Sequence, residues 1–332
     1  MSRRPARGTT ALPAALAALA VSAALTAAIA DVVRTEVVLV RHRGTAAAAL
    51  AKADACLAAV LARLPAGTDF APLLAPEAAP IDAPPGCRAA AAPTPGPAAP
   101  PRVRLVVEGR AAGGRRALEA LVGRAPAPGV PALLWLAGPP TGSSAGRILL
   151  DGHDPADPDA PRPAAVAAPA PPEALDLWLA GLGRVATPGA GPPRFAPPLP
   201  LETLANAVGA AGAGGPDALG GPAPALALVD GDLTVTAPLA AAGLLLVRGT
   251  LDIADAFEFN GVVIASGGVR VRGGASLSVR GALWVGAPPA GDPLVVDGEL
   301  RVRRDGAALA AADAQLALPR LAVLLGLRDL DG

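Results

Sequence analysis

The chain begins with an apolar stretch that is long enough to cross a lipid bilayer. Residues 11–30 carry no charge; Arg3, Arg4 and Arg7 precede them and Asp31 follows. About 20 apolar residues in a helix span the hydrocarbon core of a bilayer, and arginines beside such a span favour its cytoplasmic side. The pattern therefore predicts a transmembrane helix over 11–30 with the amino terminus in the cytoplasm.

The helical pattern continues beyond this stretch. Apolar residues recur at spacings of three and four up to Leu64, and no proline occurs from residue 14 to residue 64. One long helix over 9–64 is the simplest account of this pattern. A second interpretation stays open, because the Ala-Ile-Ala sequence at 28–30 matches the site at which secretory signals are cleaved. Against it, the apolar stretch is longer than the apolar part of an ordinary signal.

Irregular and strand-forming segments alternate downstream of the helix. Residues 65–102 are rich in Pro and Ala without a period, which indicates a connector. An irregular α/β region over 103–208 and a Gly/Ala/Pro-rich linker over 209–225 follow. Within the former we expect a hairpin of Val103–Glu108 with Arg116–Val122, two strands inside 132–153 and a short helix over 173–182.

A glycine frame recurs in the carboxy-terminal third of the chain. Each of five glycines is followed, two and four residues later, by an apolar pair, and the intervals between them are 18, 18, 14 and 17 residues. Such a repeat predicts stacked coils of a parallel β-solenoid over 226–305, with the apolar stretch 306–332 as its cap. An antiparallel meander with glycine turns stays open as the alternative. The glycines are Gly231, Gly249, Gly267, Gly281 and Gly298.

Composition narrows the functional classes. Basic and acidic residues balance at 28 each and nearly all the basic residues are Arg, so we expect no nucleic-acid partner. Cys56 and Cys87 are too few for a disulfide framework and lack the spacing of a zinc site; one disulfide and two free thiols both stay open. The fold class expected is α+β: a long amino-terminal transmembrane helix, the irregular α/β middle and the parallel β-solenoid.

Two local patterns resemble a catalytic motif and a metal-binding loop. Residues 142–146 match the GxSxG string of serine hydrolases, but prolines precede them and a strand-like run follows, where that motif needs a helix. The weak candidates for metal ligands are Asp151, Asp154, Asp157 and Asp159, and intervening prolines break the spacing of a calcium loop. With two histidines in the chain, acid–base catalysis has poor support. We expect no enzyme, no cofactor and no metal site.

The amino-terminal residues resemble a known family. The basic leader 1–8 ending in Gly8, the apolar helix beginning at Thr9 and the alanine-rich stretch 46–57 are similar to PilX-type minor pilins and related pseudopilins. The resemblance implies cleavage between Gly8 and Thr9 by a prepilin peptidase, followed by transfer of the helix from the inner membrane into a filament. Many pilins carry Glu at the fifth mature position, where this chain has Pro13.

The predicted function follows from this resemblance. It is a structural or assembly subunit of a type IV pilus or related secretion filament. It would be held in the inner membrane by one span, with the bulk of the chain in the periplasm or on the cell surface. Its expected partners are other pilin subunits, pilus assembly proteins and the prepilin peptidase. The alternative is a secreted or periplasmic β-solenoid protein with a ligand-binding or carbohydrate-active role.

Overall fold

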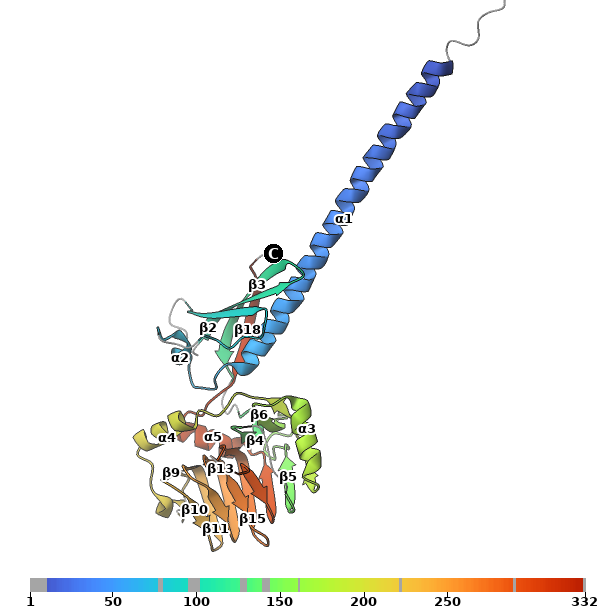
Figure 1. The fold of residues 1–332 in the computed structure, drawn as a ribbon. Helices are drawn as coiled ribbons and strands as arrows, with labels where there is room; N and C mark the ends of the chain where they lie inside the picture. Colours follow the sequence, from blue (N-terminus) through green and yellow to red (C-terminus); the bar gives the residue numbers. More distant parts are fainter. Residues whose placement is uncertain are drawn as a thin grey trace, which may run out of the picture.

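The computed structural model shows one long helix that carries two globular units (Figure 1). It describes residues 11–76, 80–94, 102–125, 130–138, 144–160, 162–220, 223–288 and 291–330. We call the part formed by residues 11–125 and 320–330 the helix–sheet unit, and the part formed by 130–319 the parallel-sheet unit. The chain enters the parallel-sheet unit after one strand of the helix–sheet unit and returns to form that strand's neighbour.

Helix α1 runs over Ala11–Arg63, 53 residues, and ends just before Pro65. At 1.5 Å per residue it is about 80 Å long. Proline disfavours helical geometry in the residue before it, which explains where the helix stops. The single long helix predicted from the spacing of apolar residues is confirmed from residue 11 onward. In the described part of the chain, α1 is the one helix that is long and apolar enough to span a membrane.

The sheet of the helix–sheet unit is antiparallel, in the order β1-β2-β3-β18. The predicted hairpin is confirmed and longer than expected, and its tight turn has positive φ at Ala112 and Gly113 (52° and 80°), as a type I′ turn requires. The predicted connector contributes a strand, β1. The elements are the short helix α2 (Ala71–Leu74), β1 (Cys87–Pro93), β2 (Arg102–Ala111), β3 (Gly114–Arg124) and β18 (Ala322–Asp329).

The core of this unit lies between the sheet and the carboxy-terminal part of α1. One face of β2 and β3 supplies valine and leucine side chains, and α1 covers them with its own apolar stripe. The edge strand β18 comes from nearly 200 residues further along the chain, and its Ala322 packs against this core. Members of the core are Cys56, Leu57, Val60, Leu64, Phe70, Val103, Leu105, Val107, Ala120 and Val122.

The parallel-sheet unit pairs all its strands in parallel. The antiparallel alternative for residues 226–305 is therefore wrong. The strands are β4 (Ala132–Leu136), β5 (Arg147–Asp151), β6 (Ala164–Ala168), β7 (Val185–Ala186), β8 (Arg194–Phe195), β9 (Ala225–Val229), β10 (Leu233–Val235), β11 (Leu239–Val247), β12 (Leu251–Ile253), β13 (Ala256–Ala265), β14 (Val269–Val271), β15 (Ser276–Val285), β16 (Leu294–Val296) and β17 (Glu299–Arg303). The helices are α3 (Pro172–Gly181), α4 (Leu201–Ala210), the 3₁₀ helix η1 (Pro216–Gly220) and α5 (Gly306–Gln315).

Successive strands alternate between two sheets. The smaller sheet has the order β10-β12-β14-β16, and the larger one runs β9-β11-β13-β15-β17-β5-β7, with β4, β6 and β8 continuing from β15. Apolar residues at matching positions stack into ladders, for example Leu233, Leu251 and Val269. Strands of the predicted middle region thus extend the same stack as those of the predicted solenoid. Parallel stacking is confirmed, whereas a closed solenoid stays a prediction.

Glycines form two ladders rather than one frame. Gly267 stacks on Gly249, which stacks on Gly231, as predicted. Gly281 instead pairs with Gly261, which pairs with Gly243, in the middle of the long strands. In the smaller sheet the rung after Val269 and Val271 is therefore Leu294 with Val296, not the predicted Leu283 with Val285. Gly298 lies between β16 and β17, and Leu300 and Val302 after it pair with Leu277 and Val279 of the larger sheet. The five-glycine frame is therefore wrong beyond Gly267, because spacing alone does not say which part of the stack a glycine occupies.

The predicted cap 306–332 has two other roles. Helix α5 covers the outer face of the larger sheet, where Leu309 and Ala312 pack with Leu244, Ile264 and Trp284. The last described residues leave the unit to form β18. At the two ends of the stack, the buried residues Leu175 of α3 and Leu219 of η1 join the inner core instead. These short helices shield the apolar interior that the first and last strands would otherwise expose.

Candidate assembly surface

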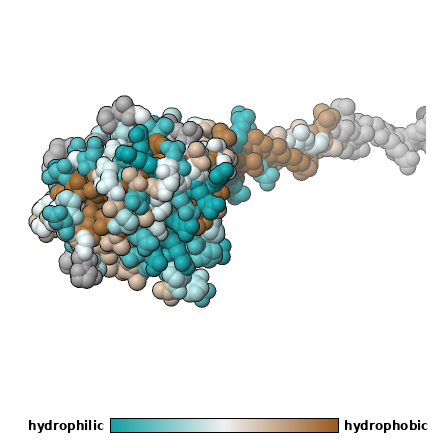
Figure 2. Space-filling model, turned by 90° about the horizontal axis from the view of Figure 1, so that it is seen from below, coloured by the Kyte–Doolittle hydropathy of each residue, from teal (hydrophilic) through white to brown (hydrophobic). Residues whose placement is uncertain are grey.

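The amino-terminal half of α1 is an unburied apolar surface. All residues from Leu16 to Gly44 are exposed, and no charged residue occurs in this segment before Asp31. Figure 2 shows this helix as a mostly hydrophobic projection beyond a surface of mixed character on the globular part. Its length and composition make α1 a candidate membrane span, and exposed apolar patches of this kind commonly mark membrane or protein contacts. The exposed large apolar residues are Leu16, Leu19, Val21, Leu25, Ile29, Val32, Val33, Val37, Val38, Leu39 and Val40.

The polar residues inside this surface do not break its apolar character. The hydroxyl of Ser22 donates to the carbonyl oxygen of Ala18 (2.7 Å), and that of Thr26 donates to the carbonyl oxygen of Ser22 (2.8 Å). A hydroxyl that is hydrogen-bonded within its own helix can enter an apolar environment without leaving a donor unpaired. The first charged side chain of the described helix is Asp31. Residues 16–30 therefore form an apolar helical segment without a charged side chain or an unpaired side-chain hydroxyl.

Further along, α1 lies so close to the sheet that only glycine fits between them. A Cβ atom on Gly109 of β2 would overlap the backbone of Ala53, and one on Gly114 of β3 would lie 2.8 Å from the carbonyl oxygen of Thr45. On the helix side, Ala49 and Ala53 are fully buried. The alanine-rich stretch noted in the sequence thus has a packing role, because small side chains permit this close approach.

A disulfide between Cys56 and Cys87 fastens α1 to the edge strand β1, with 5.8 Å between the two Cα atoms. Sequence reasoning left open whether these cysteines were bridged or free. Strand β1 is an edge strand that pairs with β2, and its partly buried alanines pack against the core. The bridge therefore ties an edge strand of the sheet to the helix.

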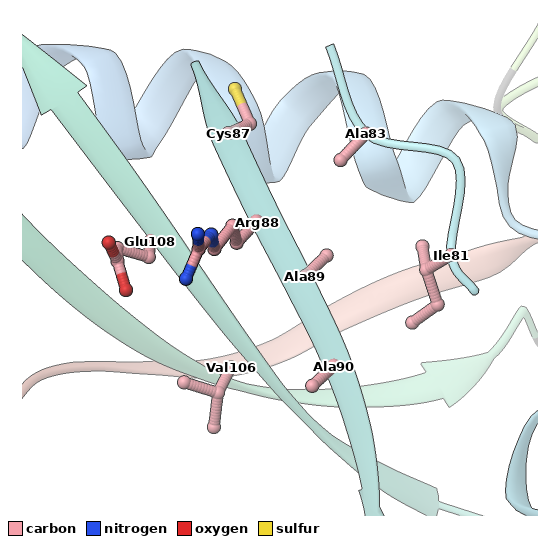
Figure 3. Close-up of a pocket in the computed structure, with 8 residues that line it drawn as sticks. All are labelled: Ile81, Ala83, Cys87, Arg88, Ala89, Ala90, Val106 and Glu108. Carbon is pink, nitrogen blue, oxygen red and sulfur yellow. The ribbon is translucent and has the colours of Figure 1, made fainter. Parts of the chain in front are cut away.

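A groove of about 530 Å³ lies beside β1 (Figure 3). Its lining consists mostly of short aliphatic side chains, and the guanidinium of Arg88 extends toward Glu108. Arg110 and Arg115 form ion pairs with Glu108, and the hydrogen bond from Arg110 is the main reason why the pKa of Glu108 is lowered. An acid held in its charged form in this way is a poor general acid or base at neutral pH. The groove offers a surface for contact rather than a reactive centre.

The serine of the GxSxG string has a structural role. Ser144 donates its hydroxyl to the carbonyl oxygen of Val296, and the strand β5 follows it. Gly142 and Ser143 lie outside the described residues. The backbone N–H of Gly146 also donates to Val296, so this segment stacks beside β16. A hydroxyl that is occupied in this way, with no helix after it, does not form a nucleophile elbow.

The acidic loop is tied into the fold rather than gathered around a common point. The carboxylate of the buried Asp154 accepts hydrogen bonds from the backbone N–H groups of Ala156 and Gly306, and it lies 3.4 Å from Nε of Arg304. Asp151 accepts from the backbone of His153 and lies 2.8 Å from its Nδ1. Among the described residues, no three His, Cys, Asp or Glu side chains are grouped to hold a metal ion.

The predicted processing residues Gly8 and Thr9 lie outside the described part of the chain. Pro13 lies within the first turns of α1. His42, the other histidine, is exposed on α1.

Sequence reasoning missed Arg124, the last residue of β3. Arg124 is 8% exposed, and its guanidinium donates to the carbonyl oxygens of Pro65 (2.7 Å), Asp69 and Arg320 (3.2 Å). Burial lowers the pKa of Arg124 to about 10, so the side chain remains charged at neutral pH. One arginine thus joins the end of α1, the end of β3 and the segment that returns from the parallel-sheet unit. No local pattern marks it, because its partners are backbone atoms of distant segments.

Comparison with known proteins adds no assignment. No protein-family model, no curated protein and no solved structure matches the chain.

Proposed function

We propose that this chain is a structural or assembly subunit of a type IV pilus or a related secretion filament, similar to PilX-type minor pilins. The observation that carries the proposal is the division of α1. Its amino-terminal half is apolar and exposed, whereas its carboxy-terminal half is packed and disulfide-bonded onto a small antiparallel sheet. Such a helix has one half for burial outside the subunit and one half for the subunit's own core.

In this proposal the exposed half of α1 lies first in the inner membrane, with the amino terminus in the cytoplasm. A prepilin peptidase cleaves between Gly8 and Thr9. The helix then moves into the filament, where the α1 helices of other pilin subunits replace lipid around it. Both environments are apolar, so the transfer needs no large change in solvation. Pilus assembly proteins and other pilin subunits are the partners.

The parallel-sheet unit acts as the displayed part. We interpret its stacked strands as the coils of a β-solenoid, since ladders from both sheets share one apolar core. It is inserted between the adjacent strands β3 and β18, so both of its ends are anchored in the helix–sheet unit. A rigid stack held at two points suits adhesion or contact with further subunits better than catalysis, and we propose no enzymatic activity.

Mass spectrometry of the mature amino terminus in the membrane fraction tests this proposal. An amino terminus at Thr9 is expected. An amino terminus at Asp31 would contradict the proposal and favour a secreted or periplasmic β-solenoid protein, since α1 would then lose its apolar span. An uncut Met1 or Ser2 would contradict both.

A further inference from the structure

The outer face of one flank of the parallel-sheet unit is rich in arginine. Along β15 and β17 the inward residues, such as Leu277 and Leu300, are fully buried, while the residues between them point outward. The same alternation holds along β5. The exposed arginines of this face are Arg147, Arg184, Arg280, Arg301 and Arg303.

Strand register brings these arginines together. Arg280 of β15 pairs in register with Arg303 of β17, and neighbouring strands lie about 4.8 Å apart. Arg147 of β5 lies beside Glu299 of β17, and Arg184 directly precedes the paired strand β7. The four strands thus display five arginines on one face, with Glu299 and Asp151 among them.

Carboxylates neutralise only part of this charge. Glu299 lies 2.9 Å from Arg301 and 3.8 Å from Arg147, and Asp151 lies 3.6 Å from Arg303. Arg184 and Arg280 have no ion-pair partner within the described ranges. The surface therefore holds excess positive charge.

A groove of about 400 Å³ crosses this surface over β7, β5 and β17. Arg147, Arg184 and Arg301 lie along it with Glu299, while Leu149 and Ala186 provide apolar surface between them. Guanidinium groups pair with carboxylates through two parallel hydrogen bonds. The combination matches a sugar acid, whose carboxylate would pair with an arginine while the apolar C–H face of its ring rests on the aliphatic side chains.

We propose that this arginine groove binds a carboxylated polysaccharide. The register places Arg147, Arg301 and the Arg303–Arg280 pair at three successive levels along the strands, so the arginines form a patch that extends beyond the groove. Exposed charge pairs of this kind are weak one at a time, so a polymer with many carboxylates gains most from the array. The inference goes beyond the assembly role and does not depend on it.

Nucleic acid fits this surface less well. Single-stranded nucleic acid is bound through aromatic side chains that stack on the bases, and Phe257, Phe259, Trp135 and Trp284 are all buried. The groove is lined by no aromatic side chain. The chain as a whole carries no net positive charge.

The test uses the full chain purified in detergent and measures its binding to polygalacturonate, with dextran as the uncharged comparison. Binding to polygalacturonate is expected, weakening as salt is raised, with no binding to dextran. The double variant Arg147→Gln with Arg184→Gln should bind about tenfold more weakly. Arg270→Gln, which removes an exposed arginine from the smaller sheet, is the matched control and should bind as the parent does.

A second variant guards against loss by misfolding. Glu299→Gln removes the carboxylate that competes for Arg147 and Arg301, and it should bind polygalacturonate more tightly than the parent. Absence of binding by the parent chain, equal binding of dextran, or an equal loss in Arg270→Gln would overturn the inference. So would tighter binding of double-stranded DNA than of polygalacturonate. A mature amino terminus at Thr9 would still support the assembly role in each of these cases.

Discussion

The guanidinium of Arg124 lies over the ring of Phe70, with its central carbon 4.1 Å from the ring centroid. Both residues are buried where the helix–sheet unit joins the parallel-sheet unit. The chain leaves the helix–sheet unit at Ala125 and returns to it at Leu321. The backbone N–H of Ala125 donates to the carbonyl oxygen of Leu321. The contact therefore lies at the junction that connects the parallel-sheet unit to the helix–sheet unit.

Replacing Arg124 by methionine should destabilise this junction. The carbonyl oxygens of Pro65, Asp69 and Arg320 would lose a charged donor, which we expect to cost about 2 to 4 kcal/mol. Thermal unfolding measures the loss, and hydrogen exchange should rise at residues 316–321. Arg102→Gln, at an exposed position of the neighbouring strand, is the control and should change stability by less than about 0.5 kcal/mol. An unchanged melting temperature in Arg124→Met would refute the role of Arg124.

Removal of the disulfide should loosen β1 from α1. The bridge closes a loop with a sequence separation of 31 residues, so its loss through Cys56→Ser with Cys87→Ser should cost about 2 to 4 kcal/mol. Unfolding in urea with and without a reductant gives the same comparison in the parent protein. The double variant should be insensitive to the reductant, and equal stability of the oxidised and reduced parent would contradict the prediction.

Gly109→Val should separate the sheet from the helix. The added side chain would overlap the backbone of Ala53, which cannot move without shifting α1, and we expect a loss of about 3 kcal/mol or more. Gly44→Ala is the control, because a Cβ there meets nothing within 4 Å. It should stabilise the helix by about 0.5 to 1 kcal/mol. Similar effects of the two substitutions on the melting temperature would rule out the close packing described for Gly109.

Gly261→Ala should disrupt the ladder in the middle of the long strands. Gly261 has φ of 138°, and a Cβ there would overlap the carbonyl oxygen of Gly243 on the next strand. The backbone strain and the overlap add up, so we expect the free energy of unfolding to fall by about 2 kcal/mol or more. Gly273→Ala has open space around its Cβ and serves as the comparison. Circular dichroism during thermal unfolding measures the stability of both variants. An unchanged stability of Gly261→Ala would contradict the close packing of the glycine ladder.

Local features of the fold were predictable where the signal is local. Alternation of apolar residues located the hairpin strands, and spacings of three and four located α1, because each element repeats its own pattern. The near-constant interval between Gly231, Gly249 and Gly267 also favoured parallel stacking over the antiparallel meander. What failed were the assignments of Gly281, which lies inside β15, and of Gly298, because the strand that lies beside each glycine decides its place in the stack.

Long-range relationships were not predictable. The pairing of β18 with β3 joins segments that the whole parallel-sheet unit separates, and no pattern in residues 322–329 identifies the partner strand. In the sequence, nothing distinguishes Arg124 from any other residue at the end of a strand. The arginine groove likewise arises from register, since Arg147 and Arg301 are far apart in sequence and meet only when β5 stacks on β17. The candidate assembly surface was visible in the sequence because a continuous apolar stretch needs no partner to be recognised.

Cross-linking inside filaments tests the central claim most directly. A photo-reactive amino acid placed at Leu25, on the exposed apolar half of α1, would be activated in surface filaments sheared from cells. The same substitution at Leu177, exposed on α3 of the parallel-sheet unit, is the control. The account predicts a covalent product between this chain and a pilin subunit from position 25 and none from position 177. Absence of the chain from sheared filaments, or no product from position 25 within them, would contradict it.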